Sequence, residues 1–186
     1  RMGSSNLAIA EADESDGSFL NLPRHHLLIT NIEAEHLNYW ESLENLETGF
    51  QELIAGLKPG GQLVVCCDDP GVNDFFTRFP REHLTYSLKD PEADYYARHI
   101  ALNGESSSFD LMSGDECLCR VSLGIPGLHN VSNALGAFAL AASLGVDVRP
   151  LGRALEEFHG VDRRFTKRTS PGGYLVIDDY AHHPTE

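Results

Sequence analysis

The sequence lacks both a long apolar run and a surplus of basic residues. No stretch approaches the roughly 18 to 20 apolar residues of a membrane span, and no basic-then-apolar leader opens the chain. Lysine and arginine number 14 against 28 acids, for a formal net charge of -14, which repels phosphate backbones. We therefore expect no membrane association and no nucleic-acid partner. With 41% hydrophobic residues a core is still available, and we expect a soluble, cytoplasmic protein.

Cysteine is scarce, and its four copies are not spaced as metal ligands. Cys66 and Cys67 are adjacent, and one residue separates Cys117 from Cys119. Neither pair has the C-x2-C spacing typical of a structural zinc site, and adjacent cysteines bridge poorly. We predict four reduced thiols that pack in strands as small hydrophobic side chains.

The sequence also lacks the glycine-rich loop that binds triphosphates. No segment matches G-x-x-x-x-G-K-[ST], in which backbone amides and a lysine hold the phosphates. The glycines between Gly56 and Gly61 follow a different pattern. If the protein acts on a nucleotide, we expect this loop upstream of Arg1, in a longer chain.

Apolar runs and helical patterns alternate along the first half of the chain. Short apolar runs predict buried strands at 7–10, 27–30, 62–67 and 84–87. Between Leu43 and Leu57 the apolar residues keep helical spacing after an N-cap at Ser42, and residues 70–79 predict a second helix. The alternation predicts an α/β fold with a mostly parallel sheet flanked by helices.

The second half has a different pattern. Residues 95–125 form alternating segments separated by turns at 103–104 and 113–115, which predicts a small antiparallel β patch. Helices are expected at 131–145 and 150–158. A basic cluster follows at 163–168, and then a strand at 174–177.

The basic cluster predicts a domain boundary. It separates a first domain, residues 1–161, from the start of a second, residues 162–186. The strand at 174–177 has no following element to pack on, so we expect it to be mobile or to pair with another chain. We accordingly expect this chain to be a piece of a longer protein.

Two groups of polar residues follow apolar strands and suggest a metal site. Glu11 opens a carboxylate cluster after the first strand, and His36 closes a segment after the second. The carboxyl ends of parallel strands share one edge of the sheet, where α/β proteins place ligands, and carboxylates suit hard divalent cations. Glu11 and His36 are therefore candidate ligands of one ion. From the residues alone, two other interpretations stay open: the carboxylate cluster could be a solvent-exposed acidic turn, and His36 could be a histidine that binds no metal.

Two further groups could contact a nucleotide. Asn130 and Asn133 lie one helical turn apart, and an asparagine amide offers the donor and acceptor that an adenine edge requires. N-capping explains Asn130 as well, but not Asn133. Arg164, near the domain boundary, suits a closing phosphate clamp or, alternatively, a solvated linker.

Taken in order, five motifs resemble the Mur ligases of peptidoglycan synthesis. They are EADESDGSF (11–19), TNIEAEH (30–36), PGLHNVSNA (126–134), GVDRRF (160–165) and DDYAHHPTE (178–186). The resemblance extends over essentially the whole chain and is to the branch that adds L-alanine to UDP-N-acetylmuramate. It implies most of a central ATP-binding domain without its phosphate-binding loop, and the opening of a C-terminal Rossmann-like domain.

The resemblance also implies a reaction. ATP phosphorylates the muramate carboxylate, the amine of L-alanine attacks the acyl phosphate, and an amide, ADP and phosphate result. The matching positions are Glu11 and His36 for magnesium, Asn130 and Asn133 for adenine, and Arg164 and Asp179 for the nucleotide. Of these, Glu11, His36 and Arg164 would take part in catalysis. His182 and His183 lie in the fifth motif without individual roles.

Two alternatives stay open beside this reaction. The ligase that recycles murein tripeptide shares several of the motifs, although its counterparts of the first two differ. A non-catalytic nucleotide-binding module would need no convergence of the candidate residues. Sister ligases use a carbamylated lysine at the metal, and the absence of lysine between Arg1 and Leu57 fits the L-alanine branch. Without the phosphate-binding loop, we expect the chain alone to be inactive.

Overall fold

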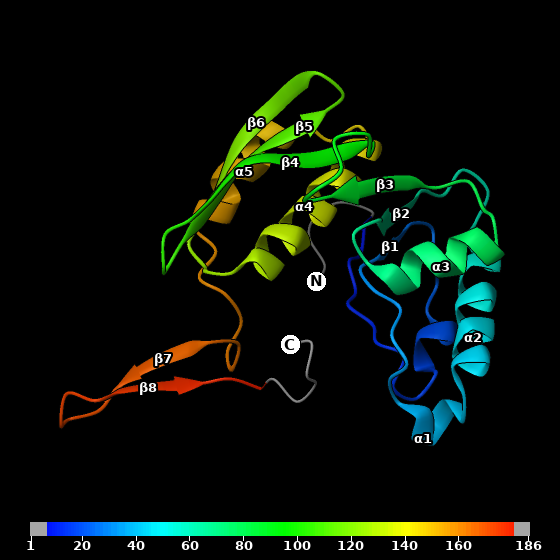
Figure 1. The fold of residues 1–186 in the computed structure, drawn as a ribbon, viewed down its shortest axis with the longest axis horizontal. Coiled ribbons are helices and arrows are strands. Elements are labelled where there is room, and N and C mark those ends of the chain that lie inside the picture. Colours follow the sequence, from blue (N-terminus) through cyan, green and yellow to red (C-terminus); the bar gives the residue numbers. More distant parts are fainter. Residues whose placement is uncertain (1–6, 181–186) are drawn as a thin grey trace.

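Six strands form one mixed sheet whose order follows the sequence (Figure 1). The computed structural model describes residues 7–180. The strands are β1 (Leu27–Ile29), β2 (Leu63–Cys66), β3 (Leu84–Ser87), β4 (Tyr95–Leu102), β5 (Ser107–Ser113) and β6 (Glu116–Leu123). β1 to β4 run parallel, and β4 to β6 are antiparallel. The predicted α/β fold is confirmed, and the antiparallel strands continue the parallel sheet because β4 pairs with β3.

Helices cover both faces of the parallel strands. The longer ones are α2 (Leu43–Ala55), α3 (Pro70–Arg78), α4 (Leu128–Ser143) and α5 (Val148–Glu156). In β2, Val64 and Cys66 share a core with α4, whereas Leu63 and Val65 share a core with α2 and α3. Successive side chains of a strand point to opposite faces, so a continuous apolar run forms a strand buried on both sides. None of the helices within residues 7–180 is long and apolar enough to cross a bilayer.

The two helices on one face are held by caps and by an ion pair. Side-chain oxygens of Ser42 and Asp69 cap α2 and α3, as predicted for Ser42. Arg78 of α3 forms a bidentate ion pair with Glu47 of α2, whose carboxylate is buried. Removing Arg78 would leave the buried Glu47 carboxylate without its partner, whereas removing Glu47 would leave Arg78 paired with Asp74.

The strand predicted at 7–10 is wrong. In the structure this segment contributes a single bridge residue, Ala8, and the side chains of Leu7 and Ile9 are 52% and 77% exposed. A short apolar run becomes a buried strand only where a sheet neighbour and a covering layer exist. Within the described residues, β1 is the outermost strand on this side of the sheet.

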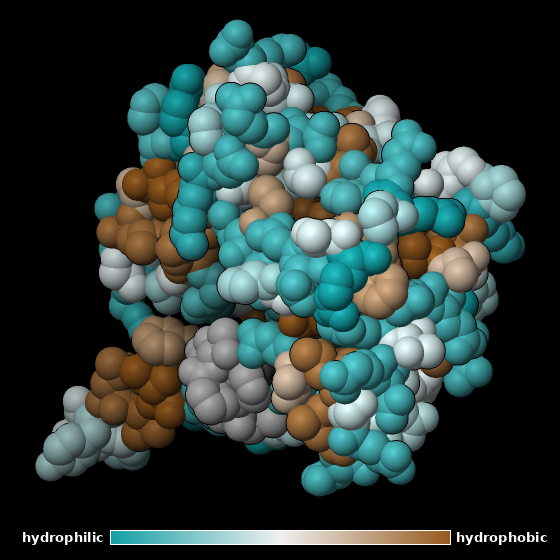
Figure 2. All heavy atoms as spheres, turned by 45° about the vertical axis from the view of Figure 1, so that its right-hand side comes forward, coloured by the Kyte–Doolittle hydropathy of each residue, from teal (hydrophilic) through white to brown (hydrophobic). Residues whose placement is uncertain are grey.

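The segment after α5 forms a separate hairpin of β7 (Thr166–Thr169) and β8 (Leu175–Asp178) (Figure 1). The expectation that the last strand lacks a partner is therefore wrong, because β8 pairs antiparallel with β7. β7 overlaps the basic cluster at 163–168, and its polar residues carry no apolar strand signal. Lys167 of β7 forms an ion pair with Glu105 in the turn between β4 and β5. Figure 2 shows hydrophobic side chains gathered on the surface of this hairpin.

The cysteines are free, as predicted. Cys66 is buried in β2, and Cys119 is half-buried in β6. Cys67 follows β2 and is half-buried, whereas Cys117 is exposed, so the predicted packing holds for only part of the set.

Candidate functional site

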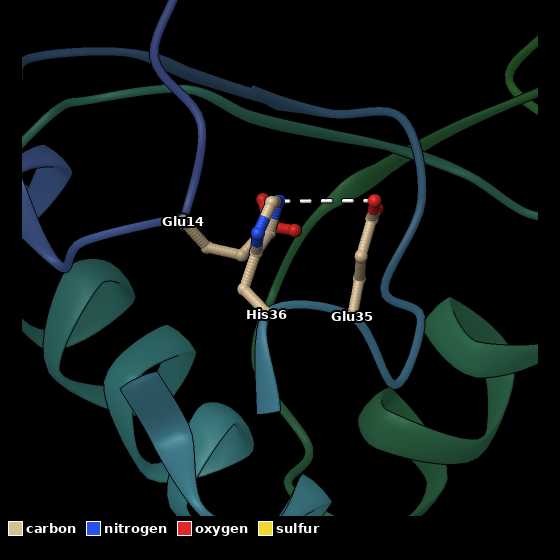
Figure 3. A group of neighbouring side chains, drawn as sticks. All are labelled: Glu14, Glu35 and His36. Carbon is tan, nitrogen blue, oxygen red and sulfur yellow. Dashed lines mark ion pairs between the residues drawn. The ribbon is translucent and has the colours of Figure 1, made fainter. Parts of the chain in front are cut away.

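Two segments bring three side chains together. The first begins after residue 10, and the second is the loop that follows strand β1. Glu14, Glu35 and His36 are half-buried and offer ligand atoms that all lie within 4.8 Å of one another. Figure 3 shows their side chains converging, with His36 Nε2 at 3.8 Å from Glu35 Oε1. Glu11 is not one of the three: it is exposed and lines a shallow hollow with Asp13 and other residues. A metal-binding role for Glu11 stays a prediction.

The donor set at this cluster fits a divalent cation. Ligands bind such ions at about 2.0 to 2.6 Å, so two ligands of one ion lie at most about 4 to 5 Å apart. The spacing of the three side chains meets that limit. Two carboxylates and one imidazole could therefore contact the same ion, and the sequence interpretation missed Glu14 and Glu35 although both lie within its motifs.

Backbone conformation sets the direction of His36. Its φ of 54° lies in the left-handed region, and it directly precedes the single-turn helix α1 (Leu37–Trp40). This region costs a non-glycine residue about 1 to 2 kcal/mol, so surrounding contacts must hold it there.

Two features at the start of α3 hold the earlier part of the loop that carries His36. Asp69 Oδ1, which caps α3, also accepts the backbone N–H of Ile32 at 3.2 Å, in the loop that carries His36. A Cβ at Gly71 would lie 1.8 Å from the Ile32 carbonyl oxygen. Residue 71 must therefore be glycine for this loop to keep its place. The only sequence signal was the Asp69-Pro70 helix start, which is local and says nothing of Ile32.

Two aspartates of the carboxylate segment, Asp13 and Asp16, have lowered pKa values. Asp13 Oδ1 accepts hydrogen bonds from the hydroxyl and the backbone N–H of Ser15 at 2.5 and 3.0 Å, and these bonds lower the pKa of Asp13. The nearby His36 lowers this pKa further, to a smaller extent. Hydrogen bonds from Ser18 lower the pKa of Asp16 in the same way.

Asn130 and Asn133 lie in the first turns of α4 with different surroundings. The N-cap is Gly127, so Asn130 does not cap the helix; its Nδ2 donates to the Pro126 carbonyl oxygen at 2.6 Å. Asn133 is exposed, and its side-chain amide has no hydrogen-bond partner within residues 7–180. The amide of Asn133 is thus available to a ligand, while one donor of Asn130 is already bonded.

Arg164 and Asp179 lie at the same end of the hairpin. The backbone N–H of Tyr180 donates to the Arg163 carbonyl oxygen at 2.7 Å, which joins the GVDRRF motif to the start of the fifth motif. The guanidinium carbons of Arg163 and Arg164 lie 4.8 and 5.9 Å from the centre of the Tyr180 ring. His182 and His183 fall outside the described residues.

Comparisons with known proteins agree on one family. Residues 4–141 match the Mur ligase middle domain. The UDP-N-acetylmuramate–L-alanine ligases of Pelotomaculum thermopropionicum and Sorangium cellulosum are 41% and 43% identical over the whole chain. The chain spans 40% and 39% of their lengths. The structure of UDP-N-acetylmuramate–alanine ligase MurC from Thermotoga maritima superposes with a TM-score of 0.76 at 30% identity, over 93% of this chain and 38% of that one.

Proposed function

Because this chain belongs to the Mur ligase family through its middle domain, we propose that it is part of an ATP-dependent ligase joining L-alanine to UDP-N-acetylmuramate. The support is the identity to two ligases of that name over every residue of the chain. We assign residues 1–161 to the ATP-binding domain and residues 162–186 to the start of a C-terminal domain. The substrates are those of cytoplasmic peptidoglycan synthesis.

The proposed chemistry activates a carboxylate that is otherwise a poor electrophile. The γ-phosphoryl group of ATP passes to the muramate carboxylate, and the L-alanine amine then attacks the carbonyl carbon and displaces phosphate. Magnesium, when bound, offsets the charge on the transferring phosphoryl group. The work of this chain is to hold the ion, orient the nucleotide and bring the reactants together.

Each candidate residue has a proposed task. Glu11 and His36 hold magnesium, and the structure adds Glu14 and Glu35 beside the imidazole. Asn133 contacts adenine through its available amide. Asn130 shares the adenine contact through the part of its amide that is not bonded to Pro126. Its hydrogen bond to the Pro126 carbonyl oxygen also orders the start of α4.

The second domain supplies the remaining contacts. Arg164 and Asp179 face the nucleotide, and their shared place at one end of the hairpin supports a joint role. An arginine delivered from a domain junction can engage phosphate when the domains close. We propose Arg164 as the catalytic member of this pair.

The observation that carries the metal site in this proposal is the convergence of Glu14, Glu35 and His36, and the fluorescence of one nearby side chain can test it. Trp40 is the only tryptophan in the chain and lies four residues after His36. Paramagnetic Mn²⁺ bound at the cluster should quench its emission saturably. His36→Ala should raise the Mn²⁺ Kd about tenfold or more, since even outer contacts of metal sites matter that much.

The matched control is His25→Ala, which removes an exposed histidine outside the cluster. It should leave the quenching curve unchanged. A wild-type chain without saturable quenching, or a His36→Ala curve equal to that of wild type, would contradict the metal site.

A further inference from the structure

One side chain joins the two segments of the proposed metal site. Trp40 ends α1, and its indole N–H donates to the carbonyl oxygen of Glu14 at 2.8 Å. This half-buried bond connects residues 26 positions apart. It ties the backbone of the carboxylate segment directly to the helix that begins after His36.

Contacts from three sides hold the indole in place. The Trp40 ring packs edge-on against Phe19 and Tyr39, with centroid distances of 6.1 and 5.0 Å. Gly49 of α2 makes room for it, since a Cβ there would lie 2.6 Å from the ring. Asn45 of α2 donates to the Trp40 carbonyl oxygen at 2.8 Å. Helix α2 therefore holds both the ring and the backbone of Trp40.

Helix α1, which carries Trp40, is too short to be stable without contacts to other elements. α1 is a single turn, and the residues on either side of it, His36 and Glu41, have left-handed φ values of 54° and 68°. An isolated turn is unstable in water because nucleation fixes several dihedral angles for one hydrogen bond. The direction of His36 thus depends on the contacts that Trp40 makes with Glu14 and α2.

We propose that Trp40 is a positioning residue for the metal site. By holding the Glu14 backbone against α1, its indole N–H sets the separation between the carboxylates of segment 11–16 and the His36 imidazole. Trp40 acts through these neighbours and does not itself bind the ion. The inference rests on the proposed function, which supplies the metal.

The test separates this role from general stability. Trp40→Phe keeps an aromatic ring and removes the N–H donor. Binding of Mn²⁺ to the 186-residue chain is measured by the electron paramagnetic resonance signal of the free aqueous ion, because this variant has lost its fluorophore. The Mn²⁺ Kd should rise about threefold to tenfold, the change expected for one lost hydrogen bond.

A second variant and a control complete the design. Gly49→Ala places a Cβ against the indole and should weaken Mn²⁺ binding in the same direction. Ser107→Ala removes a half-buried hydrogen bond of 3.1 Å to the Ile125 carbonyl oxygen, in the antiparallel half of the sheet. It should lower the Tm by an amount similar to Trp40→Phe and leave Mn²⁺ binding unchanged.

The outcomes distinguish the two proposals. If the Trp40→Phe and Gly49→Ala chains bind Mn²⁺ as wild type does, or if Ser107→Ala weakens binding equally, the positioning role is overturned while the metal site stands. If the wild-type chain takes up no Mn²⁺, the metal site fails, and the positioning role fails with it.

Discussion

At the scale of single residues, the backbone of the His36 loop depends on two positions in another element. Asp69 accepts the Ile32 N–H, and Gly71 leaves room for the Ile32 carbonyl oxygen. Both lie at the start of α3 and contribute no atom to the Glu14, Glu35 and His36 cluster. The geometry of the cluster therefore depends partly on residues that are not members of it.

Asn133 provides a test of the nucleotide site at this scale. Because the Asn133 side chain is exposed and makes no hydrogen bond in the described part of the chain, Asn133→Ala should barely change the Tm. In the whole ligase it should weaken ATP binding by about 1 to 3 kcal/mol, the cost of leaving a buried adenine group unpaired. Calorimetric titration with ATP and thermal unfolding measure the two effects.

Asn130→Ala is the comparison for stability, since it loses the bond to Pro126 and should lower the Tm, and its ATP affinity should fall as well because Asn130 shares the proposed adenine contact. If Asn133→Ala kept its ATP affinity but had a clearly lower Tm, Asn133 would be a structural residue.

At the scale of elements, a polar network ties together the three antiparallel strands. Asp110 of β5 accepts a hydrogen bond of 2.8 Å from Arg120 of β6, and its other oxygen lies 2.7 Å from His99 Nδ1 of β4. His99 has a left-handed φ of 52° where the register between β4 and β5 shifts. The network thus holds a bulge in place from two neighbouring strands.

This network should give stability a dependence on pH. Arg120 and, to a smaller extent, His99 lower the pKa of Asp110 through hydrogen bonds. A carboxyl group with a lowered folded pKa stabilises the fold above its unfolded pKa of about 3.9, and this contribution is lost as pH falls through the folded value. Asp110→Asn should cost about 0.5 to 1 kcal/mol at pH 7, because the arginine and histidine are solvent-exposed.

Urea denaturation at pH 7 and pH 3 measures the free energy of unfolding of the wild-type and Asp110→Asn chains. The difference between the two chains should be smaller at pH 3 than at pH 7. Asp115→Asn, in the turn between β5 and β6, is the control and should change stability little at either pH. An Asp110→Asn deficit of equal size at both pH values would show that the carboxylate charge is not the cause.

At the scale of the whole molecule, the hairpin β7–β8 contributes little to the main core. Tyr174 and Leu175 are 75% and 61% exposed, and no hairpin residue belongs to either core cluster within residues 7–180. The Lys167–Glu105 ion pair is one contact that reaches the six-stranded sheet. Such ion pairs at the surface contribute at most about 1 kcal/mol, so the two parts are joined weakly.

We expect the 186-residue chain to show no ligase turnover by itself. It contains no G-x-x-x-x-G-K-[ST] segment, and it spans about 40% of the length of its relatives. Orientation of reactants can supply about 7 to 11 kcal/mol of a barrier, and most of that contribution requires groups that this chain does not carry. Phosphate release with UDP-N-acetylmuramate, L-alanine and Mg-ATP measures the turnover.

The full-length Pelotomaculum thermopropionicum ligase is the positive control for this assay. Comparable turnover by the chain alone would show that it contains a phosphate site that its sequence does not reveal.

The sequence by itself determined the elements whose signals are local. The helical spacing and Ser42 cap of α2 and the apolar run of β2 predicted both elements, because side-chain period and capping act over a few residues. The motifs at 11–19 and 30–36 also predicted two polar segments close to one another, which Glu14, Glu35 and His36 confirm, although the strand at 7–10 on which the first placement rested does not form. Patterns among neighbouring residues are sufficient to predict these elements.

Only the tertiary structure decided which side chains meet. Glu14 and Glu35 lie beside His36, Trp40 bonds to the Glu14 backbone, and β8 finds its partner in the polar strand β7. Each of these contacts joins segments that carry no common local pattern. Their geometry follows from how α1, α2 and the strand ends pack in space, because hydrogen bonds and burial between distant segments exist only once the chain has folded.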